Sequence, residues 1–249
     1  MTWMKEVLPK LYRDLAKPAT REVGEALANA VKVARFVLAP VDYLAAQHQR
    51  WERYLERLAA KVLEERRIEA HPQIAGPVFA GLEYVEETGI NAELFINLLA
   101  RAIDRERVSE AHPAFAQIIS QLSPDEALIL FRLKQRSYVF RQHAVLRPDS
   151  FTFEPRTTTY NEFPVQELVF PANFGLYMDH LHSLNLAGIW QDGNSEPTME
   201  GTPPRQTGAN IKSIITLESF GKMFAQACVP DDLNPEWVEG EKDANPHDK

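Results

Sequence analysis

The sequence has little cysteine and no long apolar run. Cys228 is the only cysteine among 249 residues, which excludes a disulfide within the chain and is typical of a reducing compartment. The most apolar stretch, Ala26–Val41, contains an asparagine, a lysine and an arginine, whereas a membrane-spanning helix needs roughly 20 mostly apolar residues. Charged side chains interrupt the first residues, unlike a secretory signal. We therefore expect a cytoplasmic protein.

Positive charge is scarce in the last part of the sequence. Residues 148–249 carry 6 basic and 16 acidic side chains, whereas residues 1–70 carry 13 basic and 10 acidic ones. The whole chain has a net charge of −8. Binding to DNA draws on lysines and arginines that displace counterions from phosphates. The composition therefore disfavours the C-terminal part as a nucleic-acid-binding surface.

The sequence also lacks the short motifs of common active sites. It contains no phosphate-binding glycine loop, no Gly-x-Ser-x-Gly turn and no zinc-ligand spacing. His180 and His182 would point to different sides of a helix, so we do not expect them to share a metal ion. Cys228 ends an apolar helical stripe and is predicted to be a buried core residue. The sequence favours a binding protein over an enzyme, and it predicts no catalytic residue, cofactor or metal ion.

The segment 101–110 is dense in charge of both signs. Asp104 and Glu110 could act as acid and base if they lined a cleft. Local ion pairs at a helix end explain the same pattern more simply, and we favour that interpretation.

Apolar residues spaced three and four apart in the first half predict successive amphipathic helices. We expect helices in three ranges: residues 18–40, 74–85 and 91–102. Glu69–Pro72 and Glu110–Pro113 both read Glu-Ala-His-Pro, and each is predicted to start a helix with proline at the first helical position. Ser123, Pro124 and Glu126 have the spacing of a capping box, which predicts a further helix start.

The last third has a different pattern. Prolines and threonines accumulate over residues 137–164, which we interpret as a long irregular insertion. The following expected elements are, in chain order, a helix at Asn173–Leu184, a strand at 188–191, a flexible loop at 193–208, a strand at Ile211–Ile215 and a helix capped by Thr216. Together with the helix after Ser123, this is the order of a winged helix-turn-helix module.

These patterns predict a mainly α-helical protein with a helical region over residues 1–122. Residues 123–229 are predicted to form a winged-helix-like domain with one β-hairpin, and residues 230–249 a disordered acidic tail. Arg205 and Lys212 lie in the predicted wing and are its candidate contact residues. The predicted recognition helix has no lysine or arginine, which favours a protein partner over duplex DNA.

Several short segments, spread over about residues 5–229, carry a resemblance to a known family. In chain order they are Tyr12–Ala19, Glu22–Gly24, Ile74–Pro77, Leu94–Ala100, His112–Phe115, Gln121–Ala127, Thr216–Gly221 and Ala227–Cys228. In order and spacing they resemble the abortive infection alpha family, a bacterial domain linked to phage-resistance gene neighbourhoods and to growth arrest of infected cells. The resemblance implies a role in phage defence and brings no agreed catalytic residues.

We therefore expect a phage-defence protein of the abortive infection type that acts by binding another macromolecule, with a protein as the favoured partner. Two alternatives stay open. One is a nucleic-acid-binding regulator that uses the wing, for which salt-sensitive retention on DNA would be evidence. The other is a membrane-active effector that uses Ala26–Val41, whose small residues and two cations suit a helix at a membrane surface.

Overall fold

The computed structural model describes residues 49–147, 149, 152–235 and 237. Contacts divide the chain into two compact units, Met1–Arg53 and Tyr54–Lys249, and every element that carries a label below lies in the second unit. The segment Ala26–Val41 and most of the predicted acidic tail lie outside the described residues.

Helices form the body of the second unit. The first helix is described over residues 49–61, of which residues 54–61 belong to this unit. The other helices are α3 (Pro72–Tyr84), α4 (Ile90–Ala102), α5 (Ala114–Ile119), α6 (Pro124–Gln135), α7 (Phe174–Ser183) and α8 (Ser219–Cys228). Short 3-10 turns are η1 (Glu64–Arg66), η2 (Val108–Glu110), η3 (Val165–Glu167) and η4 (Pro171–Asn173).

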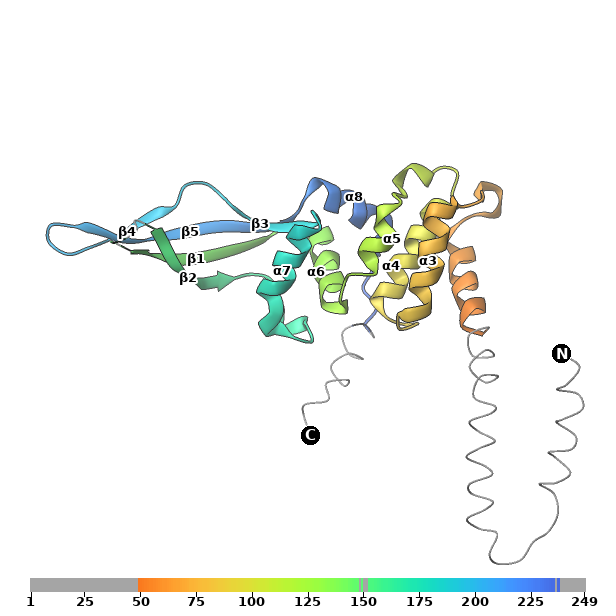
Figure 1. The fold of residues 1–249 in the computed structure, drawn as a ribbon, viewed down its shortest axis with the longest axis horizontal. Coiled ribbons are helices and arrows are strands. Elements are labelled where there is room, and N and C mark those ends of the chain that lie inside the picture. The colour runs from red at the N-terminus through yellow and green to blue at the C-terminus, as the bar shows by residue number, and fades with distance from the viewer. Residues whose placement is uncertain (1–48, 148, 150–151, 236, 238–249) are drawn as a thin grey trace, which may run out of the picture. The chain divides into compact units, whose positions relative to one another are not determined.

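Helix α4 is the central element of this body (Figure 1). Ten of its thirteen residues are buried, and it contacts α3, α5, α6 and α8. The contacts with α6 and α8 cross the boundary predicted between residues 122 and 123. Residues on both sides of that boundary therefore share one core.

The repeated Glu-Ala-His-Pro motif starts two helices, as predicted, but proline is the first helical residue only in the first copy. His71 Nδ1 accepts a hydrogen bond from the Gln73 N–H at 3.3 Å, and Pro72 is the first residue of α3. In the second copy His112 Nδ1 accepts from the Ala114 N–H at 3.1 Å, and the helix begins one residue later than in the first. In both copies the imidazole satisfies an N–H group that the first helical turn leaves unpaired.

The predicted capping box at the start of α6 is also present. The Ser123 N–H donates to Glu126 Oε2 at 2.7 Å, and the Glu126 N–H donates to Ser123 Oγ at 3.3 Å. Between them Asp125 is buried and accepts hydrogen bonds from the N–H groups of Val169 and Phe170, at 2.7 and 3.0 Å. The start of α6 thus fixes the chain that leads into α7.

An antiparallel sheet of five strands occupies the other side of the unit (Figure 1). The strands are β1 (Tyr138–Arg147), β2 (Thr152–Asn161), β3 (Ala187–Gln191), β4 (Glu196–Glu200) and β5 (Arg205–Leu217). Their order is β2-β1-β5-β3, and β4 also pairs with β5. Strand β5 is central, because β1 pairs along one side of it, while β4 pairs with its start and β3 with its end.

The prediction of a mainly α fold with a winged-helix-like domain and one β-hairpin is wrong, because the unit has a mixed α and β fold. Residues 137–164, expected to be irregular, form β1 and β2. The expected wing at 193–208 contains β4 and the start of β5. Thr216 lies in β5 and does not cap a helix, since α8 begins at Ser219.

The missed strand β2 has a physical explanation. It is an edge strand with mostly exposed side chains, so its sequence has no apolar alternation to reveal it. Its proline, Pro155, falls at a register shift in the pairing of β2 with β1. Prolines are tolerated at edges and bulges, where the missing N–H costs no ladder bond.

One face of the sheet packs on the helices through aromatic side chains. The rings of Tyr138 and Phe163 lie 5.1 Å apart, and Phe163 stacks on Phe174 of α7 at 5.1 Å. Helix α7 also contacts β3, and α6 and α8 contact β5. The base of the sheet is thus part of the same core as the helices.

Helix α8 approaches the chain between α7 and β3 very closely. A Cβ atom at Gly221 would lie 1.7 Å from the carbonyl oxygen of Leu186. That same oxygen accepts a hydrogen bond from the Glu218 N–H at 2.9 Å. Only glycine permits this approach, because the obstacle is a backbone atom held in place by a hydrogen bond.

An ion pair joins η1 to the end of α4. Asp104 is buried and accepts a hydrogen bond from Arg66 Nε at 3.0 Å, a second from Arg66 Nη2, and one from the Glu106 N–H at 3.0 Å. The hydrogen bond from Arg66 holds the pKa of Asp104 below its ordinary value, although burial acts in the opposite direction.

The substitution Gly221→Ala is expected to lower the free energy of unfolding by about 3 kcal/mol, because α8 must move away from Leu186. The matched control is Gly76→Ala in α3, where a Cβ meets no atom within 4 Å. There we expect a gain of about 0.5–1 kcal/mol from helix propensity. Urea unfolding measures both, and equal effects of the two variants would contradict the close approach.

The ion pair at Asp104 predicts a pH dependence. Since folding lowers this pKa, the carboxylate stabilises the fold above its unfolded pKa, and the contribution is lost as the pH falls through the folded pKa. Arg66→Gln should therefore flatten the fall in unfolding free energy below about pH 5. Arg105→Gln, an exposed neighbour, is the control, and identical acid profiles for both variants would refute the assignment.

Candidate functional site

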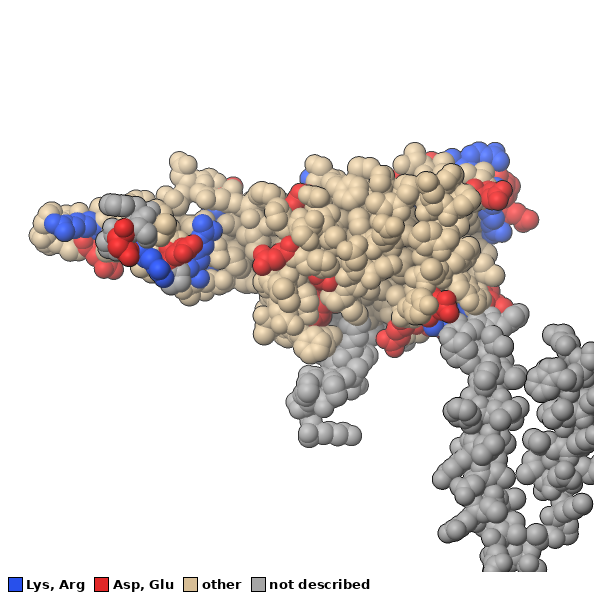
Figure 2. All heavy atoms as spheres, viewed as in Figure 1, with Lys and Arg blue, Asp and Glu red and all other residues tan. Residues whose placement is uncertain are grey.

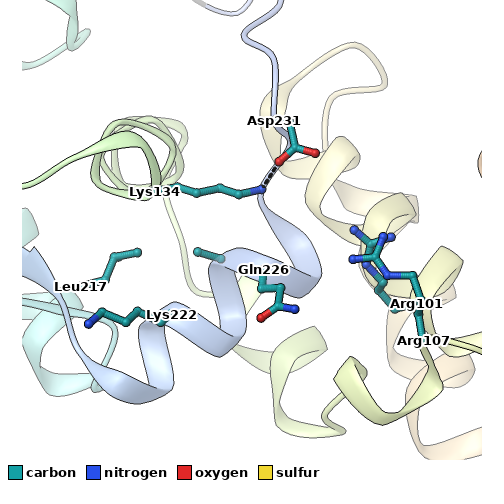
Figure 3. A pocket seen from close by; sticks show the side chains of 8 residues that line it. Arg101, Arg107, Lys134, Leu217, Lys222, Gln226 and Asp231 are labelled. Carbon is teal, nitrogen blue, oxygen red and sulfur yellow. Dashed lines mark hydrogen bonds and ion pairs between the residues drawn. The ribbon is translucent and has the colours of Figure 1, made fainter.

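A basic pocket of about 250 Å³ lies among α4, α6 and α8 (Figure 3). Its lining residues are Arg101, Arg107, Lys134, Leu217, Lys222, Ala225, Gln226 and Asp231. Four of these are cations, and each comes from a different element: α4, the residue before η2, α6 and α8. The packing of separate helices therefore concentrates positive charge.

The carboxylates near the pocket do not balance its cations. Arg107 makes a forked pair with Glu110, at 3.1 and 2.9 Å, and Arg101 Nε lies 3.2 Å from the same carboxylate. Lys134 donates to Asp231 Oδ1 at 2.7 Å. Lys222 forms no ion pair within the described part of the chain. Four cations thus face two carboxylates, which leaves two positive charges uncompensated.

Arg101 is the most constrained of these cations. Burial, together with the nearby charge of Arg107, lowers the pKa of Arg101. Its Nε–H is buried and has no hydrogen bond of good geometry among the described residues. An arginine in this state is still a cation, and the anion that faces its Nε is the Glu110 carboxylate at 3.2 Å.

Lys134 also forms a hydrogen bond with the residue that follows α8. Its Nζ donates to the carbonyl oxygen of Val229 at 2.6 Å, besides its contact with Asp231. Cys228 beside them is fully buried, and burial raises the pKa of its thiol well above the ordinary value. The prediction that Cys228 is a core residue is confirmed.

The histidines and acids singled out in the sequence lie in separate pairs. His180 Nδ1 lies 2.5 Å from Glu126 Oε1, and His182 Nδ1 lies 2.9 Å from Glu218 Oε1. Within the residues that the structure describes, no three His, Cys, Asp or Glu side chains are grouped as metal ligands would be. Asp104 pairs with Arg66, 38 residues away in the chain, and not with a neighbour as the expectation of local ion pairs required. Glu110 does pair locally, with Arg107.

The candidate contact residues Arg205 and Lys212 both lie on β5, at different levels of the sheet. Arg205 is exposed at the start of the strand, opposite Glu200 of β4. Lys212 is exposed near the middle, and its Nζ lies 2.5 Å from Asp192 Oδ2. Lys212 therefore lies in the middle of the sheet, opposite Arg141 of β1, whereas Arg205 lies at the end of β5 that pairs with β4.

Lys212 belongs to an exposed patch that we call the outer sheet face: Arg141, Tyr160, Trp190 and Lys212. Arg141 of β1 is paired with Lys212 on one side and with Tyr160 on the other, and its guanidinium lies 5.5 Å from the Tyr160 ring. Trp190 is opposite Ile214, two residues further along β5, so it projects on the same side. Tyr160 and Trp190 are each 47% exposed.

The family model of abortive infection alpha matches residues 46–228. The chain belongs to the abortive infection alpha family. The matched range includes every strand and all the pocket cations of this family member, and it leaves out Ala26–Val41. No curated protein and no solved structure matches the chain. The helices that the structure describes are all too short or too polar to cross a membrane.

Exchanging the two pocket lysines for methionine should have different effects on stability. Lys134→Met is expected to lower the free energy of unfolding by about 1–3 kcal/mol, because charge-assisted hydrogen bonds to Val229 and Asp231 are lost. Lys222→Met should change it by less than about 0.5 kcal/mol, since that lysine has no ion pair to lose. Parallel urea unfolding measures the difference, and equal losses would contradict the pairing described here.

Proposed function

We propose that this member of the abortive infection alpha family acts in phage defence by binding another protein through the outer sheet face. Membership of the family supports the role in defence. The observation that supports the binding surface is the exposure of Trp190 and Tyr160 beside two cations on paired strands of the sheet.

The outer sheet face has the composition of an interface centre. Tryptophan, tyrosine and arginine are the residues that most often dominate binding energy between proteins. The indole ring of Trp190 lies over Gly188, where a Cβ atom would be 2.8 Å from its Nε1, and it also contacts the His182 ring at 5.4 Å. Side chains already held in one orientation lose little conformational entropy when a partner binds.

The two cations favour a partner that presents acidic groups. Arg141 and Lys212 are directly opposite each other on paired strands, an arrangement that destabilises a sheet. Asp192 pairs only with the charge of Lys212. Arg141 has the Tyr160 ring beside it and not a carboxylate of this patch. A carboxylate from a partner would relieve the remaining repulsion, and the two aromatic rings would supply the apolar contact area.

Charge favours a protein partner over nucleic acid. The five strands carry five basic and three acidic residues, an excess of only two positive charges, and the two signs are interspersed over the sheet (Figure 2). Residues 148–249 as a whole are strongly acidic. Such a surface has few cations available to release counterions from a polyanion, so the gain in free energy from that source is small.

A phage challenge tests this function. Expression of the wild-type protein in a phage-sensitive bacterium is expected to lower the plating efficiency of at least one phage in a panel. Trp190→Ala should lose most of that protection, because truncating an interface tryptophan typically costs about 2 kcal/mol or more, about thirtyfold in affinity. The matched control is Tyr84→Ala, an aromatic residue 83% exposed at the end of α3.

Three results would contradict the proposal. The first is full plating of every phage in the panel, and the second is equal protection by Trp190→Ala and the wild type at equal protein levels. The third is retention of the pure protein on DNA at about 50 mM salt, provided that this retention is lost at about 200 mM salt. The Arg141→Ala variant would also have to lose it. That last result would assign the outer sheet face to nucleic acid instead.

A further inference from the structure

We infer that a cavity bounded by α3, α4, α5 and the start of α6 binds a small, neutral and mostly apolar molecule through one N–H or O–H donor. We call it the Asn91 cavity, and its volume is about 450 Å³. The inference does not rest on the proposed function, because the cavity and the outer sheet face consist of different residues. It rests on a buried acceptor without a partner, on walls that are almost free of charge and on the size of the cavity.

The helices around the Asn91 cavity pack closely on one another. Helices α3, α4 and α5 contact each other in every pair, and they lie side by side in Figure 1. The Phe95 ring is fully buried and lies against the backbone of α3, where a Cβ atom at Gly81 would be 2.2 Å from it. Because such close packing leaves the walls little room to move, the cavity does not collapse when it is empty.

Asn91 supplies the buried acceptor. Its Nδ2 donates to the carbonyl oxygen of Leu122 at 2.7 Å, and this contact fixes the orientation of the amide. The Oδ1 atom of the same amide is buried and accepts no hydrogen bond from the part of the chain that the structure describes. A buried acceptor without a donor is unfavourable, so a ligand that donates a hydrogen bond to it gains binding energy.

The other groups that line the cavity favour a neutral donor. Ser120 Oγ already donates to the carbonyl oxygen of Ala116 at 3.0 Å, so its hydrogen is in use. Glu86 is exposed and is the one charged side chain that lines the cavity, where it would repel an anion. Ile90 and Asn91 are the first residues of α4, and the positive end of the helix dipole disfavours a cation there. A neutral molecule avoids both penalties.

The remaining walls and the volume suit a small ring system. A volume of about 450 Å³ lies within the range of about 300–1,000 Å³ that is usual for small-molecule sites. Such sites combine apolar walls with a few polar groups that orient the ligand. The apolar residues that line this cavity are Val85, Ile90, Phe95, Ile119, Leu122 and Pro124.

Indole and indene are the probes that test the site, because they have nearly the same shape and only indole has an N–H donor. Both are titrated into the ¹⁵N-labelled full chain and followed by NMR. We expect saturable binding of both, with indole about tenfold tighter because it alone donates to Asn91 Oδ1. The amides of Gly81 and Gly89, which line the cavity, should shift, whereas those of Gly175 and Gly193 should not.

The variant Asn91→Ala should abolish the preference for indole over indene. The matched control is Asn194→Ala in the exposed loop between β3 and β4, which should keep the preference. If Asn91 only supported the fold, its loss would weaken both probes equally and leave the ratio of their affinities unchanged. The ratio therefore separates a binding role from a structural one.

Three results would overturn the inference. If neither probe binds saturably to the wild type, the cavity takes up water only. Equal affinities of the wild type for indole and indene, or an indole preference that persists in Asn91→Ala, would exclude the acceptor from binding. Shifts confined to Gly175 and Gly193 would place the bound probe outside the cavity.

Discussion

The packing of α8 against α4 and against the backbone at Leu186 is the contact on which the rest of the second unit depends. Strand β5 runs into α8, so the position of this helix also fixes the central strand of the sheet. On the helical side, Asn97 of α4 donates to the carbonyl oxygen of Cys228 at 2.9 Å in a buried site. Glycine at position 221 makes this packing possible, because no other residue fits against the Leu186 carbonyl.

Both candidate surfaces follow from that packing. The basic pocket exists because the packing of α8 against α4 and α6 encloses a cavity that cations from all three helices line. The outer sheet face exists because β5, anchored at its end by α8, holds Lys212 beside Arg141 of β1. In both places the fold brings like charges together at some cost in stability. An anionic group bound at either place would offset that cost.

The sequence predicts those features that depend on neighbouring residues. The capping box at Ser123 and the helix start at Pro72 were predicted because their signals lie within a few residues. The strand at 211–215 was predicted from its β-branched residues. Strands β1 and β2 were not, because bulges and an exposed edge remove the alternation that would reveal them. The pocket was not predicted either, since its lining residues come from α4, α6 and α8 and share one cavity only through tertiary packing.

Native-state hydrogen exchange tests most directly whether α8 is an integral part of the core. The account predicts that the slowest amides of α8 and of α4 exchange with the same free energy of opening, through unfolding of the whole unit. Protected amides in α4 together with α8 amides that open at a free energy lower by about 2 kcal/mol or more would contradict it. In that case α8 would detach on its own, and neither the pocket nor the sheet would have the fixed geometry described here.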